Sequence, residues 1–195
     1  MPNRSSGDRT KIILANSLRN LMKKKPVDKI KIREIVEDCD LNRQTFYYHF
    51  QDMYALIEWM YRYDGQQIIG ETFDGQNVLK TTRAFLEYVE EHREEIISVL
   101  ESKAQVYFSN FLKEGIGVCC DIVIDKYSKN MKITREYKSF LSIYYTSAVL
   151  GVALDWIKKG DSSRLTSDEL LQMFVNTTTG SLELALNNYK AEDDN

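Results

Sequence analysis

The sequence predicts an all-α protein with a head formed by residues 1–52 and a larger helical body formed by residues 53–195. Along most of the chain, apolar residues recur at the i, i+3, i+4, i+7 spacing of a helix face, whereas the strict alternation typical of strands is scarce. Both prolines, Pro2 and Pro26, lie in the head, so no proline interrupts a helix of the body. With 43% hydrophobic and 28% charged residues, the composition is that of an ordinary soluble globular protein.

The first helix of the head is expected to run from a cap at Ser6 or Asp8 to about Lys24. Its apolar face consists of Ile13, Leu14, Leu18, Leu21 and Met22. The Lys23–Lys25 run places positive charge at the negative end of the helix dipole, and Pro26 prevents the helix from continuing. These lysines could also contact phosphates, although a solvated helix end explains them equally well.

The stretch Ile30–Phe50 is expected to form two short helices joined by a tight turn. Apolar residues at positions 32, 35, 36 and 39 give the first of them a buried face. Residues 40–42, Asp-Leu-Asn, then interrupt this helix, since Asp and Asn side chains bond nearby backbone, and Asn42 can cap a second helix. In that second helix Phe46 and Phe50 share one face. This is the pattern of a helix-turn-helix, although such helix pairs also occur in ordinary helical cores.

The run Thr45-Phe46-Tyr47-Tyr48-His49-Phe50 resembles the T-x-Y-x-H-F signature that closes the recognition helix in the TetR family of bacterial transcription regulators. The resemblance covers roughly residues 9–63. It implies a three-helix helix-turn-helix head that binds double-stranded DNA, and a helical body with a two-helix dimerisation face. In the family, the body senses a small molecule or a partner protein. Two positions depart from the pattern: Met53 replaces a common Lys, and Asp40 replaces a small residue, often Gly.

A narrower resemblance is to the branch that contains dihydroxyacetone kinase operon regulators. It rests on Gln44-Thr-Phe-Tyr, on Asp52-Met-Tyr-Ala-Leu-Ile-Glu-Trp-Met-Tyr, and on Trp156-Ile-Lys-Lys-Gly. Some members of that branch activate transcription through a partner protein, without a ligand of their own. An activator with a protein coactivator is therefore the alternative to a regulator that senses a small molecule.

The second helix of the motif carries the side chains expected to read DNA. Arg43 and Gln44 lie at its N-terminal end, which enters the major groove first; Arg can bond guanine and Gln adenine bidentately. On the preceding helix, Arg33 occupies a family position that often reaches a base or a phosphate. The remaining predicted DNA contacts are Lys31, Thr45, Tyr47, Tyr48 and His49, which offer charge, hydroxyl, ring and imidazole groups. For each tyrosine, half-buried packing is the competing interpretation.

The distribution of charge agrees with this interpretation. The net charge of the whole chain is −3, but residues 1–50 carry 11 Lys and Arg against 6 Asp and Glu, a net +5, which leaves −8 on the other 145 residues. A basic head on an acidic body suits DNA binding through the head alone.

The body is expected to contain helices at about 53–69, 78–91, 93–101, 104–127, 134–159 and 167–189, with a loop at 72–77 and an acidic tail at 191–195. Gly160 supplies a C-terminal stop, and Thr166 with Glu169 fits a capping box. The last two helices are apolar around much of their circumference, more than one small body can bury. We therefore expect a homodimer through Ser147, Ala148, Gly151, Leu154, Phe174 and Leu182; the alternative is a monomer with a thick core.

A small-molecule effector pocket is expected among the aromatic residues of the body. The candidates are Tyr107, Phe108, Phe111, Tyr137, Tyr144 and Tyr145. Aromatic stripes at helical spacing also form ordinary cores, so both interpretations stay open at this stage.

Other classes of protein find little support. Cys39, Cys119 and Cys120 form no C-x-x-C pair, and His49 and His92 belong to no metal-ligand motif, so no metal or cofactor is expected. The remote alternative, an all-helical enzyme or carrier, lacks a phosphate-binding glycine loop and a nucleophile elbow. The polar N-terminus indicates no signal peptide, and no apolar run approaches the roughly 20 residues of a membrane span, so a cytoplasmic protein is expected.

Overall fold

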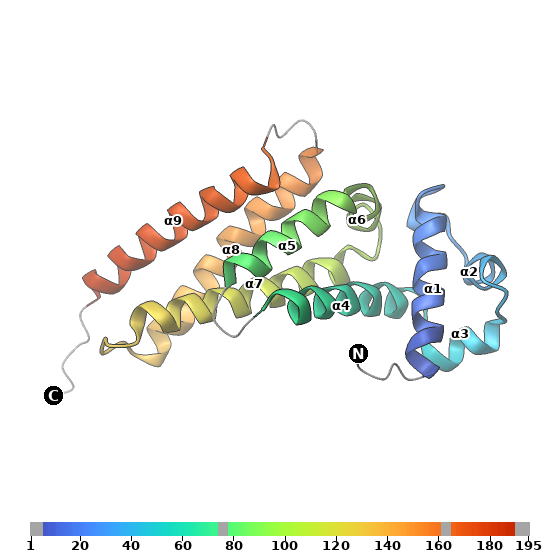
Figure 1. The fold of residues 1–195 in the computed structure, drawn as a ribbon, viewed down its shortest axis with the longest axis horizontal. Helices are drawn as coiled ribbons and strands as arrows, with labels where there is room; N and C mark the ends of the chain where they lie inside the picture. Colours follow the sequence, from blue (N-terminus) through green and yellow to red (C-terminus); the bar gives the residue numbers. More distant parts are fainter. Residues whose placement is uncertain (1–5, 74–77, 161–164, 190–195) are drawn as a thin grey trace. The chain divides into compact units, whose positions relative to one another are not determined.

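The structure is a computed structural model that describes residues 6–73, 78–160 and 165–189 (Figure 1). Within these ranges the regular structure is entirely helical. The elements are α1 (Ser6–Met22), the short 3-10 helix η1 (Val27–Lys29), α2 (Ile32–Asp38), α3 (Arg43–His49), α4 (Met53–Thr72), α5 (Val78–Glu91), α6 (Arg93–Leu100), α7 (Gln105–Ser128), α8 (Arg135–Lys159) and α9 (Ser167–Asn188). The all-α prediction is confirmed, and most helix ends fall within two residues of those predicted.

The departures from the predicted helices are local. α1 ends at Met22, before the lysine run, and Val27–Lys29 forms a 3-10 turn that the periodicity did not predict. α4 continues to Thr72, beyond the predicted end. The tip of the predicted 72–77 loop and the acidic tail at 191–195 lie outside the described residues.

The chain forms two compact units, and the limits of these units differ from the predicted domain boundary after residue 52. One unit comprises residues 1–67 and 92–111, and the other comprises residues 68–91 and 112–195. The start of α4 belongs with the head because Leu56, Ile57 and Tyr61 are fully buried there. Tyr61 packs edge-on against Phe108, with ring centroids 4.6 Å apart, which brings the N-terminal part of α7 into the same unit.

The second unit packs α5, α8 and α9 with the larger part of α7. Its core cluster consists of Cys120, Ile124, Leu141, Tyr145, Leu182 and Leu186, drawn from α7, α8 and α9. α5 lies against α9, where Arg83 forms an ion pair with Asp168. Burial raises the pKa of the Cys120 thiol, so this side chain serves as a small apolar core residue.

The predicted signals at the ends of α8 and α9 are confirmed. Gly160 ends α8 with φ 52°, a left-handed backbone angle that glycine adopts without a steric cost. At the start of α9, the Thr166 hydroxyl accepts from Glu169 N, while the Glu169 carboxylate accepts from Thr166 N at 2.9 Å, which completes the capping box.

Among the described helices, α8 has the length and apolar composition of a possible membrane span, with a mean hydropathy of 1.4 over its most apolar window. The sequence interpretation had found no such run. A core helix of a soluble protein passes the same test of length and composition, and 33% of this window of α8 is buried inside the protein.

Candidate nucleic-acid interface

The three helices of the head hold one another through an apolar core. α1 packs against α2 and α3, and α2 packs against α3. Leu14 and Leu18 of α1, Ile35 of α2 and Phe46 of α3 are all fully buried. The Ser17 hydroxyl donates to the carbonyl of Ile35 at 2.8 Å, which fixes α2 on α1. The predicted helix-turn-helix therefore rests on a packed support.

The turn between α2 and α3 depends on a strained residue. Asp40 has φ 54°, the left-handed region in which glycine is the usual residue and Asp is tolerated better than most. The reversal lets Leu41 N donate to the carbonyl of Val36 at 2.8 Å, which closes the end of α2. The departure at Asp40 thus leaves the motif intact and adds a local strain.

Asn42 caps α3, as predicted. Its side-chain oxygen accepts from Thr45 N at 2.8 Å and from the Thr45 hydroxyl at 3.1 Å. The hydroxyl proton of Thr45 is therefore engaged within the helix end, and a phosphate would have to be bound by other groups. The cap sets the direction of the first turn of α3, where Arg43 and Gln44 lie.

The outer side of α3 is open to solvent. Arg43 and Gln44 are exposed, and Tyr47 and Tyr48, which follow the fully buried Phe46 by one and two residues, are 56% and 84% exposed. For these tyrosines the structure thus disfavours the competing interpretation of half-buried packing. His49 is half-buried and lies edge-on to Tyr48, with ring centroids 4.9 Å apart. The side chains on this side of α3 that can bond or stack are thus largely open to solvent, and the Tyr47 ring also lies edge-on to Phe46, with centroids 5.5 Å apart.

α2 adds cations beside α3. Arg33 is exposed, and its Nε atom donates to the Glu37 carboxylate one turn on at 2.5 Å; this hydrogen bond raises the pKa of Arg33. Lys31 is exposed at the N-cap of α2, where its backbone N–H donates to Glu34 at 2.9 Å. An ion pair with Lys25 lowers the pKa of that Glu34 carboxyl. This exposed pair engages the Nε atom of Arg33, so a DNA phosphate would compete with Glu37 for the guanidinium.

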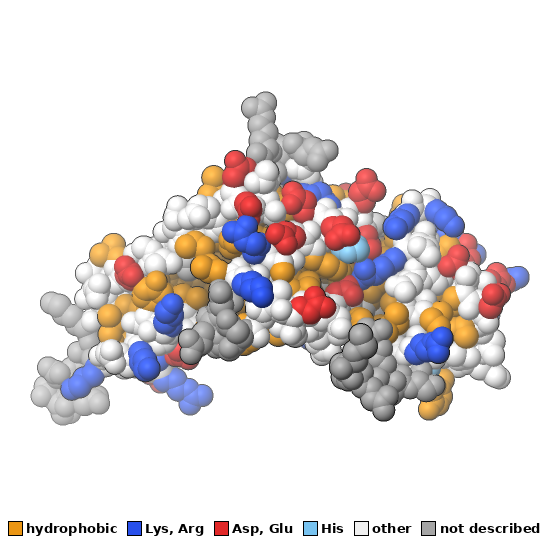
Figure 2. Space-filling model, viewed as in Figure 1, with side chains coloured by type: hydrophobic (Ala, Val, Ile, Leu, Met, Phe, Trp, Pro, Cys, Tyr) orange, Lys and Arg blue, Asp and Glu red, His pale blue; other side chains and the backbone are white. Residues whose placement is uncertain are grey.

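The start of α4 and the end of α1 flank the helix-turn-helix formed by α2 and α3. Asp52 caps α4 by accepting from Ala55 N at 2.8 Å, and Met53, half-buried, brings no cation to the position where the family commonly has Lys. The Lys23–Lys25 run follows α1, and Figure 2 shows basic side chains at that end of the helix.

Sequence reasoning missed a charged cluster inside the first unit. Arg19 of α1 forms an ion pair with Asp64 of α4 and lies 3.8 Å from Glu95 of α6, while His92 Nδ1 lies 3.5 Å from the same Glu95. The Glu95 side chain is only 8% exposed, and burial raises its pKa. The cluster ties α1 to α4 and α6. The one available signal was an arginine at the edge of the apolar face of α1.

The predicted dimer residues fall into three groups. Ser147, Ala148 and Gly151 are exposed on α8, and Leu154 and Phe174 are half-buried. Leu182 is wrong as an interface residue, because it is fully buried in the core of its own chain. Two residues on, Leu184 is 62% exposed and takes the outward position on α9.

The six predicted effector residues are divided between the two units. In the first, Tyr107 stacks on Tyr54 with ring centroids 5.7 Å apart, and Phe108 and Phe111 pack with Tyr61. In the second, the Tyr137 hydroxyl donates to the carbonyl of Ala185, and the Tyr145 hydroxyl bonds Ser181. Tyr144 points outward, 56% exposed. Most of these rings have packing partners, and a pocket lined by them stays a prediction.

Among the residues that the structure describes, no group of three or more His, Cys, Asp or Glu side chains could hold a metal ion.

A three-helix head whose capped third helix is open to solvent, joined to a helical body, has the architecture of a helix-turn-helix transcription regulator. Two family models match the chain. The model described as "Bacterial regulatory proteins, tetR family" matches residues 15–60, and the model described as "Transcriptional regulator C-terminal region" matches residues 76–180. The chain belongs to the TetR family.

A curated protein and a solved structure are similar to this chain over most of its length. The "HTH-type dhaKLM operon transcriptional activator DhaS" of Lactococcus lactis subsp. lactis is 22% identical over 172 residues, which cover 85% of this chain and 89% of that protein. The solved structure of "Dihydroxyacetone kinase operon activator DhaS" matches with a TM-score of 0.73 at 21% identity, over 90% of this chain and 97% of that one, and shows the same fold. Both relatives are transcription regulators.

Proposed function

We propose that this regulator binds an inverted-repeat operator as a homodimer and reads each half-site with α3. The observation that carries the proposal is the open side of α3, where Arg43 and Gln44 follow the Asn42 cap, and Tyr48 is 84% exposed. A major groove about 12 Å wide admits such a helix, and its N-terminal residues reach the base edges.

One copy of a short helix contacts too few base pairs to select one site in a genome. A dimer places two recognition helices roughly 34–36 Å apart, one helical turn of DNA, which doubles the sequence that is read.

The second unit offers a surface for this dimer. On α8, Phe140, Ile143, Tyr144 and Val152 are each about half exposed or more, and they surround the small residues Ser147, Ala148 and Gly151. On α9, Met173 and Leu184 are 52% and 62% exposed. Clustered exposed apolar side chains are typical of a protein interface, and small residues permit close approach of helices.

Sedimentation velocity tests the dimer with a matched pair of variants. Ile143→Glu places a charge on the α8 face, where Ile143 is 65% exposed, and we expect it to give a monomer. Val118→Glu places the same charge on α7 at a residue that is 60% exposed, and should leave a dimer. A parent protein that sediments as a monomer at micromolar concentration, or two variants that behave alike, would contradict the assignment of this surface.

Selection of bound sequences from a random DNA pool tests the operator. We expect an inverted repeat, and Arg43→Ala should relax the preference at one position per half-site at a cost of about 1–3 kcal/mol. Asn20→Ala, an exposed change on α1, serves as the control. Recovery of the same consensus with Arg43→Ala would show that another side chain reads that base.

Salt dependence tests the contribution of phosphate contacts. Affinity for the selected operator should fall steeply between low and physiological salt, because each neutralised phosphate releases counterions. An affinity that does not change with salt would contradict binding dominated by phosphate contacts. Base contacts would then dominate, because Met53 is uncharged and Arg33 is paired with Glu37.

A second candidate concerns the direction of regulation and the signal. Both relatives carry the name of an operon activator, and their similarity spans most of this chain, so we also propose activation of an operon through a coactivator protein. A cytoplasmic location follows from DNA as the partner. Transcription from a reporter that carries the selected operator would rise on expression of an activator and fall for a repressor. A small-molecule effector, in turn, would release DNA from the purified protein without any second protein.

A further inference from the structure

A continuous row of rings leads from the open side of α3 to the side of α4. The rings are those of Tyr48, His49, Phe50, Trp59 and Tyr63, and successive centroids lie 4.9, 6.5, 5.9 and 5.0 Å apart. This aromatic row lies entirely within the first unit. Its outer end is the 84% exposed Tyr48, whereas Phe50 in its middle is only 6% exposed.

Trp59 is the ring of the row at which three helices meet. It lies edge-on to Phe50, the C-cap residue of α3, and stacks on Tyr63 with an interplanar angle of 20°. Trp59 and Tyr63 share one face of α4 because they are four residues apart. From α1, the Lys11 ammonium lies 5.7 Å from the centroid of the Trp59 ring, a cation–π geometry. One half-buried side chain thus touches α1, α4 and the end of α3.

α3 needs support of this kind because it has only seven residues. An isolated helix of that length is not stable in water, so its order depends on its caps and its packing. Asn42 caps the N-terminal end, and the fully buried Phe46 anchors the middle. At the C-terminal end Phe50 packs against Phe46 and against Trp59, and the contact with Trp59 ties this end to another helix.

We propose that Trp59 is a positioning residue for DNA binding, which holds the C-terminal end of α3 so that Tyr48 and His49 meet the DNA in a fixed orientation. The inference rests on the proposed function, in which α3 reads the half-site. Trp59 acts through Phe50 and His49, not through a base contact of its own. Side chains that are held before binding bind more tightly, because less conformational entropy is lost when the complex forms.

A positioning role affects sequence-specific binding more than non-specific binding. Non-specific binding depends on cations that neutralise phosphates, and it tolerates loosely held side chains on the recognition helix. A loss of folded protein would instead lower both affinities by the same factor. The ratio of operator affinity to random-duplex affinity therefore separates positioning of α3 from general support of the fold.

Fluorescence anisotropy of labelled operator and labelled random duplex, titrated with the full chain, measures this ratio. In Trp59→Leu we expect the ratio to fall about twofold to tenfold, the usual value of an aromatic pair. Trp59→Phe keeps a ring against Phe50 and should restore most of the ratio. An unchanged ratio in Trp59→Leu, with a parent that prefers the operator, would refute the positioning role alone. A parent without any sequence preference would contradict the proposed function, and this inference with it.

A double-mutant cycle tests whether the effect passes along the row. Tyr48→Ala should lower operator affinity in the parent, and by a smaller factor in Trp59→Leu, where the Tyr48 ring is no longer held in place. Equal factors in the two backgrounds would show that the two rings act independently and would refute the connection.

The emission of Trp59 gives a measurement that leaves the row intact. The chain has two tryptophans, and Trp156→Phe removes the other one, which is 2% exposed in the second unit. Because linkage between two events is reciprocal, operator binding should tighten the packing around Trp59 and shift its emission, and random duplex should shift it less. Identical emission with and without saturating operator would overturn the proposal even if Trp59→Leu does not fold.

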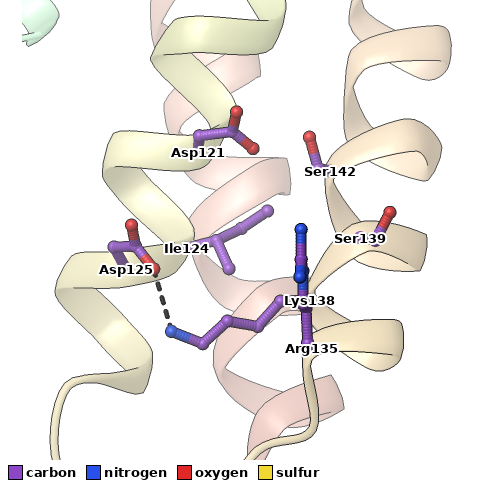
Figure 3. A pocket seen from close by; sticks show the side chains of 7 residues that line it. All are labelled: Asp121, Ile124, Asp125, Arg135, Lys138, Ser139 and Ser142. Carbon is purple, nitrogen blue, oxygen red and sulfur yellow. Dashed lines mark hydrogen bonds and ion pairs between the residues drawn. The ribbon is translucent and has the colours of Figure 1, made fainter.

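Two contacts of the second unit supply matched controls. Figure 3 shows the groove between α7 and α8, across which Lys138 pairs with Asp125 at 2.8 Å. Tyr88 of α5 is a half-buried ring 6.1 Å from that of Phe85. Lys138→Gln and Tyr88→Leu should leave the affinity ratio unchanged, because neither residue belongs to the unit that contains the row. A fall in Tyr88→Leu as large as that in Trp59→Leu would make the effect general and would refute the role of Trp59.

Discussion

The cluster around Arg19 allows a quantitative test of how α1 is held on α4 and α6. Replacing Arg19 by Met keeps most of the aliphatic stem and removes the cation that pairs with Asp64 and lies 3.8 Å from Glu95. The Glu95 side chain is 8% exposed, so its carboxylate would be left buried with His92 as the remaining neighbouring base. Breaking a buried pair by removing one partner costs about 3–5 kcal/mol.

The cost should depend on pH in a definite direction. Burial raises the pKa of Glu95 above its ordinary value, and Arg19 opposes that rise, so the pKa should be higher still in Arg19→Met. A raised folded-state pKa means that the folded state binds the proton more tightly, and the stabilisation by protonation is lost as pH rises through that pKa. The penalty of Arg19→Met should thus be larger at pH 8 than at pH 5, because Arg19 stabilises the ionised form of the Glu95 carboxyl and not the protonated form.

Urea unfolding of the parent, Arg19→Met, Glu95→Gln and the double variant at several pH values measures this. Glu95→Gln removes the buried charge, so in the double variant the pH dependence of the penalty should disappear and part of the stability should return. Lys159→Met breaks an exposed ion pair with Asp155 and should cost no more than about 0.5 kcal/mol at any pH. A penalty of Arg19→Met that is the same at both pH values, or one that Glu95→Gln increases, would refute this account.

Three further predictions concern backbone and surface positions. Gly65→Ala should be less stable than Gly70→Ala by about 1–3 kcal/mol in thermal unfolding, since an added Cβ would lie 2.8 Å from the Phe111 ring at Gly65 and would meet nothing at Gly70; equal stabilities would show that Phe111 moves aside freely. Asp40→Gly should stabilise the head by about 0.5–1 kcal/mol by relieving its left-handed backbone, and a loss of stability would indicate an unrecognised role of the carboxylate. Tyr48→Ala should change the unfolding free energy by less than about 0.5 kcal/mol while weakening operator binding in a filter assay, because the ring is 84% exposed; unchanged binding would remove Tyr48 from the interface.

Elements with local signals could be predicted from the sequence. The Asn42 cap, the Thr166 capping box and the Gly160 stop depend on residues within a few positions of the helix end, so the helices they bound were placed almost correctly. The exposed side of α3 could also be predicted, because Phe46 and Phe50 define its buried side.

Features that depend on distant partners could not be predicted. Asp64, the partner of Arg19, lies 45 residues away in the chain, and nothing in the pattern of α1 indicates an ion pair. Leu182 was misassigned because α9 has apolar residues on several sides, and only packing decides which of them face α7 and α8. Periodicity reports which residues can share a face of a helix, not which neighbour covers that face.

Two helices, α4 and α7, each belong to both compact units: α4 passes from one to the other after Gln67, and α7 after Phe111. An α-helix is stiff along its axis, and the 20 residues of α4 form a rod about 30 Å long. The chain crosses a third time between Glu91 and His92, where α5 ends and α6 begins, so two of its three crossings between the units fall within a helix.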